Sequence, residues 1–141
     1  MANLKIYFAG SIRGGREDAA LYKQIIKHLA KHGNVLTEHL GDNTLTDMGE
    51  DKPAVEVFER DVNWVKEADV IVAEVTTPSL GVGYEIGKAE EFGKKTLCLY
   101  RGELRKLTPM VAGNANLLTK TYETLEDAAL IIDNFFKEFR K

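Results

Sequence analysis

A glycine-rich segment near the start of the chain could hold an anion. Residues 10–16 read Gly-Ser-Ile-Arg-Gly-Gly-Arg and separate an apolar run from an amphipathic stretch. Glycines let backbone amides approach an anion, the start of a helix adds partial positive charge, and Arg13 can pair with phosphate oxygens. The segment lacks the pattern of a Walker loop and the spacing of a dinucleotide fingerprint. We expect it to bind a phosphate; the alternative is a flexible turn with a solvated arginine.

A second segment of this kind precedes another expected helix. Residues 77–85 read Thr-Pro-Ser-Leu-Gly-Val-Gly-Tyr-Glu, so Ser79 offers a hydroxyl and Gly81 a bare backbone amide to an anion. We expect Glu85 within the first turn or so of the helix, where the macrodipole would help to keep its carboxylate ionised at neutral pH. Displacement at the anomeric carbon of a sugar needs such a carboxylate. The alternative is a glutamate that merely caps its helix.

Other side chains could complete a site for glycosidic bond cleavage. Asp61, on an expected helix, could protonate a leaving base or activate water, although a helical aspartate is more often solvated. Tyr7 could hydrogen-bond the nucleophile or a sugar hydroxyl, or belong to the core. His39 could contact a base, whereas His28 and His32 are expected to face solvent. The histidines and the single cysteine show no pairing at ligand spacing, so we expect no metal.

Strands and helices alternate along the chain. The expected strands are residues 4–9, 34–37, 69–75, 95–100 and 117–122, and the expected helices are 21–29, 54–65, about 83–92 and 125–139. This alternation predicts an α/β three-layer sandwich with a five-stranded, mostly parallel sheet. Ligands bind such sheets at the carboxyl ends of the strands, so the two glycine-containing segments should face one another there. Residues 40–52 lack apolar periodicity and are expected to form a mobile loop that could close over a ligand.

The composition excludes several classes of protein. The 141 residues are 44% apolar and 29% charged, which predicts one domain over residues 1–141. A net charge of −3 provides no global positive field, so a nucleic-acid polymer is not an expected partner. The apolar run near the N-terminus is too short for a signal peptide or a membrane span, so we expect a cytosolic protein and no membrane partner. Cys98 lies in an apolar run and is expected in a buried strand.

Residues 7–15, 36–39, 61–64 and 73–85 together resemble the 2′-deoxynucleoside 5′-monophosphate N-hydrolases, which belong to the nucleoside 2-deoxyribosyltransferase superfamily. The resemblance covers nearly the whole chain. It implies a flavodoxin-like (Rossmann-like) fold, a homodimer, and no metal or organic cofactor. It also implies hydrolysis of small deoxynucleoside monophosphates to a free base and 2-deoxyribose 5-phosphate.

The resemblance further implies roles for individual residues. Glu85 matches the nucleophile, Asp61 the acid/base carboxylate, and Tyr7 the residue that positions the nucleophile. In the family a serine from the partner subunit completes the phosphate site; here Thr108 stands in its place, which keeps the hydroxyl and adds a methyl group. The expected substrate- and phosphate-binding residues are Gly10, Ser11, Ile12, Arg13, Gly14, Ser79, Gly81, His39, Thr108 and Met110.

Three other activities stay open at this point. A nucleoside 2-deoxyribosyltransferase would pass the sugar to a second base, and a ribonucleotide N-glycosidase would accept a 2′-hydroxyl. A non-catalytic nucleotide-binding module would need no carboxylates. Arg13 and the two anion-binding turns favour hydrolysis of a phosphorylated substrate, and the combination of Tyr7, Asp61 and Glu85 favours an enzyme. The sequence does not determine the preferred base.

Overall fold

The computed structural model describes residues 3–11, 18–37 and 51–141, and strands and helices alternate through them. In chain order the elements are β1 (Leu4–Ala9), α1 (Ala19–Leu29), β2 (Gly33–Val35), α2 (Ala54–Glu67), β3 (Val70–Glu74), α3 (Leu80–Glu91), β4 (Lys95–Tyr100), the 3-10 helix η2 (Leu104–Lys106), α4 (Pro109–Ala112), β5 (Leu118–Thr121) and α5 (Leu125–Phe139). Among these residues, no helix combines the length and apolar character needed to cross a membrane.

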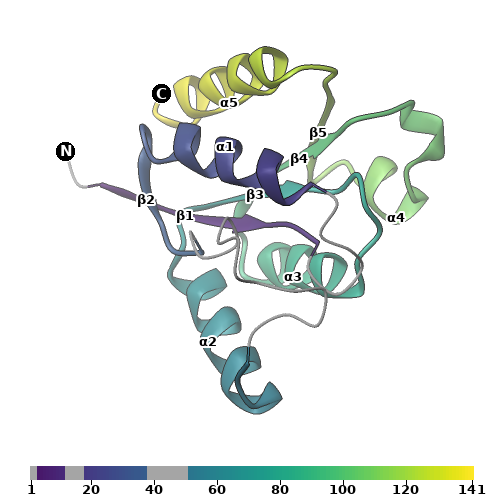
Figure 1. The fold of residues 1–141 in the computed structure, drawn as a ribbon. Coiled ribbons are helices and arrows are strands. Elements are labelled where there is room, and N and C mark those ends of the chain that lie inside the picture. The colour runs from purple at the N-terminus through teal and green to yellow at the C-terminus, as the bar shows by residue number, and fades with distance from the viewer. Residues whose placement is uncertain (1–2, 12–17, 38–50) are drawn as a thin grey trace.

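The five strands form one sheet in the order β2-β1-β3-β4-β5 (Figure 1). All four pairings between neighbouring strands are parallel. The flavodoxin-like order has its switch point between β1 and β3, where the connections leave the sheet in opposite directions. The predicted flavodoxin-like α/β fold is therefore confirmed. The described residues just after β1 and β3 lie at the edge where such sheets bind ligands.

Helices cover both faces of the sheet, with α1 and α5 on one face and α2 and α3 on the other (Figure 1). Each face has its own buried apolar cluster. Successive residues of a strand point to opposite faces, so Phe8 packs with the α1 and α5 side and Tyr7 with the α2 and α3 side. The alternation along β1 thus directs the Tyr7 side chain towards the helices that carry Asp61 and Glu85.

The start of α3 differs from the prediction. The helix begins at Leu80 rather than near Gly83, because Ser79 caps it and its Oγ accepts a hydrogen bond from the amide of Val82 at 3.2 Å. Gly81 therefore lies inside the first helical turn rather than in a loop. The sequence analysis also missed the short helix α4, whose four residues are too few to show helical periodicity.

Two other expectations concern single segments. Cys98 is buried in β4 as predicted, and burial raises the pKa of its thiol to about 12, so it is not poised as a nucleophile. The predicted mobile loop at residues 40–52 lies outside the described residues except for its last two, Asp51 and Lys52, which are exposed.

Candidate active site

Tyr7 and Glu85 join the first strand to the third helix. The Tyr7 phenol is buried and donates a hydrogen bond to Glu85 Oε2. Burial raises the pKa of Glu85 to about 7; the hydrogen bond from Tyr7 lowers it and the charge of Asp61 raises it. Burial therefore opposes the ionisation that the helix dipole was expected to favour: Glu85 lies five residues after the helix begins, where the dipole is weak and desolvation is the larger effect.

The same burial acts on the tyrosine. It raises the pKa of Tyr7 well above its ordinary value, and the charges of Glu85 and Asp61 raise it further. The phenol therefore stays protonated at any physiological pH and can always donate to Glu85. A permanent donor fixes one carboxylate oxygen and leaves the other to face the neighbouring space.

Glu85 borders a cleft between α2 and α3 that also contains Asp61. The cleft has a volume of about 480 Å³, which is within the range of small-molecule sites. Its lining is mainly apolar, with a few polar groups placed among the apolar side chains. The lining residues are Phe58, Asp61, Val62, Val65, Leu80, Gly81, Tyr84, Glu85 and Lys88.

A neighbouring arginine orients Asp61. The Nε and Nη2 atoms of Arg60 both lie 2.9 Å from Asp61 Oδ1. The guanidinium stands over the ring of Trp64, 4.7 Å from its centroid, which limits the conformations open to the arginine. Since the charge of Asp61 acts on both Tyr7 and Glu85, the structure brings together the three residues that the sequence analysis expected to carry the chemistry.

Gly81 leaves space beside the second oxygen of Glu85. A Cβ atom built at Gly81 would lie 3.9 Å from Glu85 Oε1 and 3.8 Å from Ser79 Oγ. Those are ordinary contact distances, so a side chain here would not strain the helix but would occupy the approach to Oε1. Ser79 and Gly81 therefore lie beside Glu85 at the start of α3, where helix amides favour an anion.

The start of the first glycine-containing segment packs on Tyr22 of α1. A Cβ atom at Gly10 would lie 2.9 Å from the Tyr22 ring, so a larger residue would displace it. The amide of Ser11, itself buried, donates to the Tyr22 hydroxyl at 3.0 Å. The sequence analysis missed this anchor, since Tyr22 shows only the spacing of a core residue. The expected site residues Ile12, Arg13, Gly14 and His39 lie outside the described residues.

Thr108 and Met110 do not line the Glu85 cleft of the single chain. Thr108 caps α4, and its Oγ1 accepts a hydrogen bond from the Met110 amide at 3.4 Å. Met110 is 82% exposed. Both residues are therefore presented to solvent, where they could reach a second molecule.

Comparison with known proteins identifies the family. The sequence profile described as nucleoside 2-deoxyribosyltransferase matches residues 6–133. This chain belongs to the nucleoside 2-deoxyribosyltransferase family. It is 52% identical over 118 residues to the 5-hydroxymethyl-dUMP N-hydrolase of Rattus norvegicus, covering 82% of this chain and 72% of that protein. It is 47% identical over 139 residues to the 5-hydroxymethyl-dUMP N-hydrolase of Danio rerio, covering 96% and 95% of the two chains.

A solved structure supports the same fold. The solution structure of BlsM superposes with a TM-score of 0.78 at 22% identity and covers 98% of this chain and 93% of that one. The resemblance inferred from the sequence motifs is confirmed by the family match. The chemical roles assigned to single residues of this family member stay predictions.

The sequence analysis missed a second buried carboxylate of this family member. Glu74, at the end of β3, is fully buried and accepts hydrogen bonds from the Tyr122 hydroxyl, the Thr76 amide at 2.7 Å and the Thr76 hydroxyl at 2.8 Å. Burial raises its pKa, and these hydrogen bonds oppose the rise. The available signal was an acidic residue inside an otherwise apolar strand.

An arginine extends this second network. Arg101 Nη2 lies 3.0 Å from both carboxylate oxygens of Asp18, and Nη1 lies 3.4 Å from the Tyr122 hydroxyl. The Arg101 amide also donates to the Thr76 hydroxyl at 2.9 Å. The network ties the residue just before α1 to the ends of β3, β4 and β5.

The prediction that His28 and His32 face solvent is wrong. Their side chains are only 17% and 18% exposed, and the Nε2 atom of each lies 2.7 Å from Asp133 Oδ1 of α5. The physical reason is that α5 packs against α1 and covers this face of the helix. The spacing of four residues between the two histidines was the signal in the sequence. It is also a spacing found in metal sites, so the interpretation that the histidines show no pairing at ligand spacing was wrong.

Proposed function

We propose that this protein hydrolyses the N-glycosidic bond of 2′-deoxynucleoside 5′-monophosphates to a free base and 2-deoxyribose 5-phosphate. The observation that carries the proposal is the placement of Glu85. Tyr7 holds its Oε2 atom, while Oε1 borders the space that Gly81 leaves free in the cleft. Two relatives that are 52% and 47% identical in sequence and are named 5-hydroxymethyl-dUMP N-hydrolase support this class of reaction.

In the first step Glu85 Oε1 attacks the anomeric carbon from the side opposite the base. A carbon–oxygen bond forms, the carbon–nitrogen bond breaks, and its electron pair leaves with the base, which takes a proton from Asp61 or from water. The transition state resembles an oxocarbenium ion. A deoxy sugar favours it, because no electron-withdrawing 2′-hydroxyl opposes positive charge at the anomeric carbon.

In the second step water releases the sugar from Glu85. The water oxygen bonds to the anomeric carbon while Asp61 accepts a proton from the water. The ester bond between the sugar and Glu85 breaks at the same time. Arg60 keeps the Asp61 carboxylate in place through the contacts at 2.9 Å. The configuration at the anomeric carbon is retained overall, because each step inverts it.

Binding of the 5′-phosphate would orient the sugar in this proposal. The segment that starts at Gly10 and the start of α3 at Ser79 both follow strands at the switch point of the sheet. Arg13 would pair with the phosphate and His39 would contact the base. Binding energy from the phosphate, remote from the reacting bond, can hold the anomeric carbon against Glu85.

We also propose that the protein is a homodimer with a shared phosphate site. Three apolar residues of α2 and α3 that line the cleft are exposed: Phe58 to 53%, Leu80 to 96% and Tyr84 to 52%. A group of exposed apolar side chains is typical of an interface. Thr108 of one subunit would contact the phosphate bound by the other, with the exposed Met110 beside it. The expected cytosolic location stays a prediction.

A pair of surface substitutions tests the dimer. Phe58→Glu would place a charge on the proposed interface, and Leu130→Glu is the matched control because Leu130 is 61% exposed on α5, on the other face of the sheet. Light scattering after size exclusion should show a monomer for the first variant only. A dimeric Phe58→Glu protein would contradict the proposed interface.

Free-base release tests the reaction. Wild type and Glu85→Gln are assayed with the four deoxynucleoside 5′-monophosphates, 5-hydroxymethyl-dUMP, the matching ribonucleotides and the unphosphorylated nucleosides. We expect base release from deoxynucleoside monophosphates alone, and its loss in Glu85→Gln. Release from nucleosides only with an added acceptor base would instead indicate a transferase. Equal rates on ribo- and deoxynucleotides would contradict the deoxy preference, and no release from any compound would indicate a binding module.

A further inference from the structure

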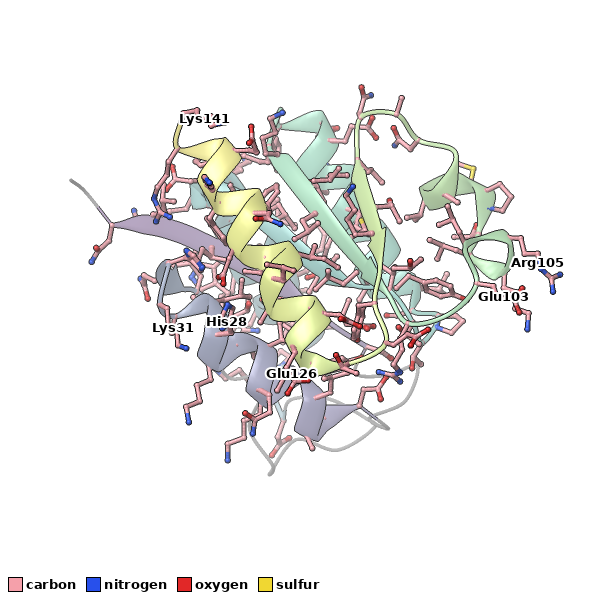
Figure 2. All side chains as sticks on the ribbon, turned by 90° about the horizontal axis from the view of Figure 1, so that it is seen from above. His28, Lys31, Glu103, Arg105, Glu126 and Lys141 are labelled. Atoms are coloured by element: carbon pink, nitrogen blue, oxygen red, sulfur yellow. The ribbon has the colours of Figure 1, made fainter. Side chains whose placement is uncertain are left out.

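Two histidines and an aspartate converge on the face of the molecule formed by α1 and α5. His28 lies on α1 and His32 follows the end of that helix by three residues, while Asp133 belongs to α5. Figure 2 labels His28 on α1, beside α5. One ligand atom from each of the three residues lies within 4.8 Å of the other two. The group lies on the opposite side of the sheet from α2 and α3, and the proposed hydrolysis does not use it.

We propose that His28, His32 and Asp133 bind a divalent transition metal ion of the zinc class. Imidazole nitrogens and a carboxylate oxygen are ligands that such ions prefer. Metal–ligand bonds of about 2.0–2.2 Å in a tetrahedral site place the ligand atoms roughly 3.3 Å apart. The two Nε2 atoms now lie 2.7 Å from Asp133 Oδ1. Small side-chain shifts would therefore admit an ion, with water as a fourth ligand.

Packing holds the ligands in place before an ion arrives. The His32 ring stacks on the buried ring of Phe136, with centroids 4.5 Å apart and planes 7° from parallel. His28 meets His32 edge to face at 5.8 Å. Asp133 is 49% exposed, so its side of the group is open to solvent and to an entering ion. An ion bound by the two histidines and by Asp133 would link α1 to α5 and raise the stability of the fold.

Arg140 limits the affinity of this site. Its Nη1 atom lies 3.4 Å from His32 Nδ1, and its Nη2 atom donates to the His32 carbonyl at 2.6 Å. The contact with Nδ1 favours the tautomer whose proton is on Nε2 and points to Asp133. A metal on Nε2 needs the proton on Nδ1 instead. Metal binding must therefore break this contact, in addition to overcoming repulsion from the guanidinium.

Titration of tag-free protein with ZnCl₂ tests the site, with calorimetry and thermal unfolding as the two measurements. We expect one ion per chain and a thermal midpoint that rises with zinc and returns on addition of EDTA. His28→Gln, His32→Gln and Asp133→Asn should each bind at least about 10-fold more weakly, because each replaces an imidazole or carboxylate ligand by a weaker amide group. His39→Gln removes the third histidine of the chain and is the matched control; its zinc affinity should equal that of wild type.

Visible absorption of bound Co²⁺ reports the ligands independently of protein stability. A band of a nitrogen- and oxygen-ligated site should appear in wild type and be absent from the His28→Gln/His32→Gln double variant. Arg140→Gln should bind zinc several-fold more tightly; unchanged or weaker binding would overturn the assignment of Nε2 as the ligand atom. Wild type without zinc binding, or a double variant that binds zinc as well as wild type, would overturn the site itself.

Discussion

Two glutamate–tyrosine pairs occur in the described part of the chain, and their surroundings differ. Glu74 is fully buried, and Tyr122 together with the amide and hydroxyl of Thr76 occupies both its oxygens. Glu85 is bound by Tyr7 at Oε2, and its Oε1 borders the open space beside Gly81. Burial raises the pKa of both carboxyls. A perturbed pKa alone therefore does not mark the reactive group; an oxygen directed into a cleft does.

The largest expected effect separates the two glutamates by activity. Glu85→Gln should lower kcat for base release by at least about 10³-fold, because the covalent route is lost. Glu74→Gln, corrected for the folded fraction, should stay within a few-fold of wild type. Initial rates of base release, with circular dichroism to measure the folded fraction, check both values. A Glu74→Gln protein that is folded and inactive would contradict the claim that only Glu85 takes part in the reaction.

The next effect separates them by stability. Glu74→Ala should lower the free energy of unfolding by about 3 kcal/mol, because it leaves a cavity and buried donors of Tyr122 and Thr76 without an acceptor. Urea denaturation monitored by circular dichroism measures the change. Glu123→Ala, at an exposed position before α5, is the control and should have no effect. A Glu74→Ala protein as stable as wild type would show that the network is not structural.

Asp61 should contribute less than Glu85 to the reaction. Asp61→Asn should lower kcat by about 10²-fold, the size expected for loss of a general acid or base. Steady-state kinetics at several pH values measures the change. A variant with wild-type kcat would leave Arg60 and Asp61 with a structural role only.

The contribution of Glu85 to the stability of the fold should depend on pH in a defined direction. The folded pKa of Glu85 is raised to about 7, so its contribution to stability is fully present below its unfolded pKa and is lost as pH rises through 7. Glu85→Gln should therefore stabilise the fold by about 1 kcal/mol at pH 8 and have little effect at pH 4. Urea denaturation at both pH values measures the change. A variant that is less stable than wild type at pH 8 would contradict the claim that burial of the ionised Glu85 carboxylate destabilises the fold.

The smallest effect is a shift of the pH profile. Because Glu85 must be ionised to attack, kcat/KM should rise with pH through about 7. Tyr7→Phe removes the hydrogen bond that lowers the pKa of Glu85 and should move the rise in kcat/KM to higher pH. Asp61→Asn removes a charge that raises the pKa and should move it to lower pH. The phosphate of the substrate also ionises in this pH range, but it affects the profiles of all variants equally, so the differences between variants report on Glu85. Shifts of the Tyr7→Phe and Asp61→Asn profiles in the same direction would contradict the proposed electrostatics.

Local patterns of the sequence predicted the fold and three of the residues that line the cleft, Asp61, Gly81 and Glu85. Alternating apolar runs and helical spacing gave the five-stranded sheet, and the motif around Glu85 led to the family that the comparisons confirm. The start of α3 was placed too late because the glycines at positions 81 and 83 suggested a loop, whereas the Ser79 cap determines where the helix begins.

Contacts between distant residues could not be predicted from the sequence. Arg101 meets Asp18 only because β4 ends beside the start of α1, and no local pattern encodes that contact. The raised pKa of Glu85 likewise depends on burial by neighbouring elements. His28 and His32 had a readable spacing, but their partner Asp133 lies about a hundred residues further along the chain.

Chemical rescue of Glu85→Ala by azide tests most directly that Glu85 is the group that attacks the sugar. Removal of the carboxylate leaves room for a small anion on the side of the sugar opposite the base. The account predicts that azide restores base release and gives the α-anomer of 1-azido-2-deoxyribose 5-phosphate, identified by NMR, because a single displacement inverts the β-nucleotide. A β-azide, or base release that azide does not restore in a folded variant, would contradict the role of Glu85.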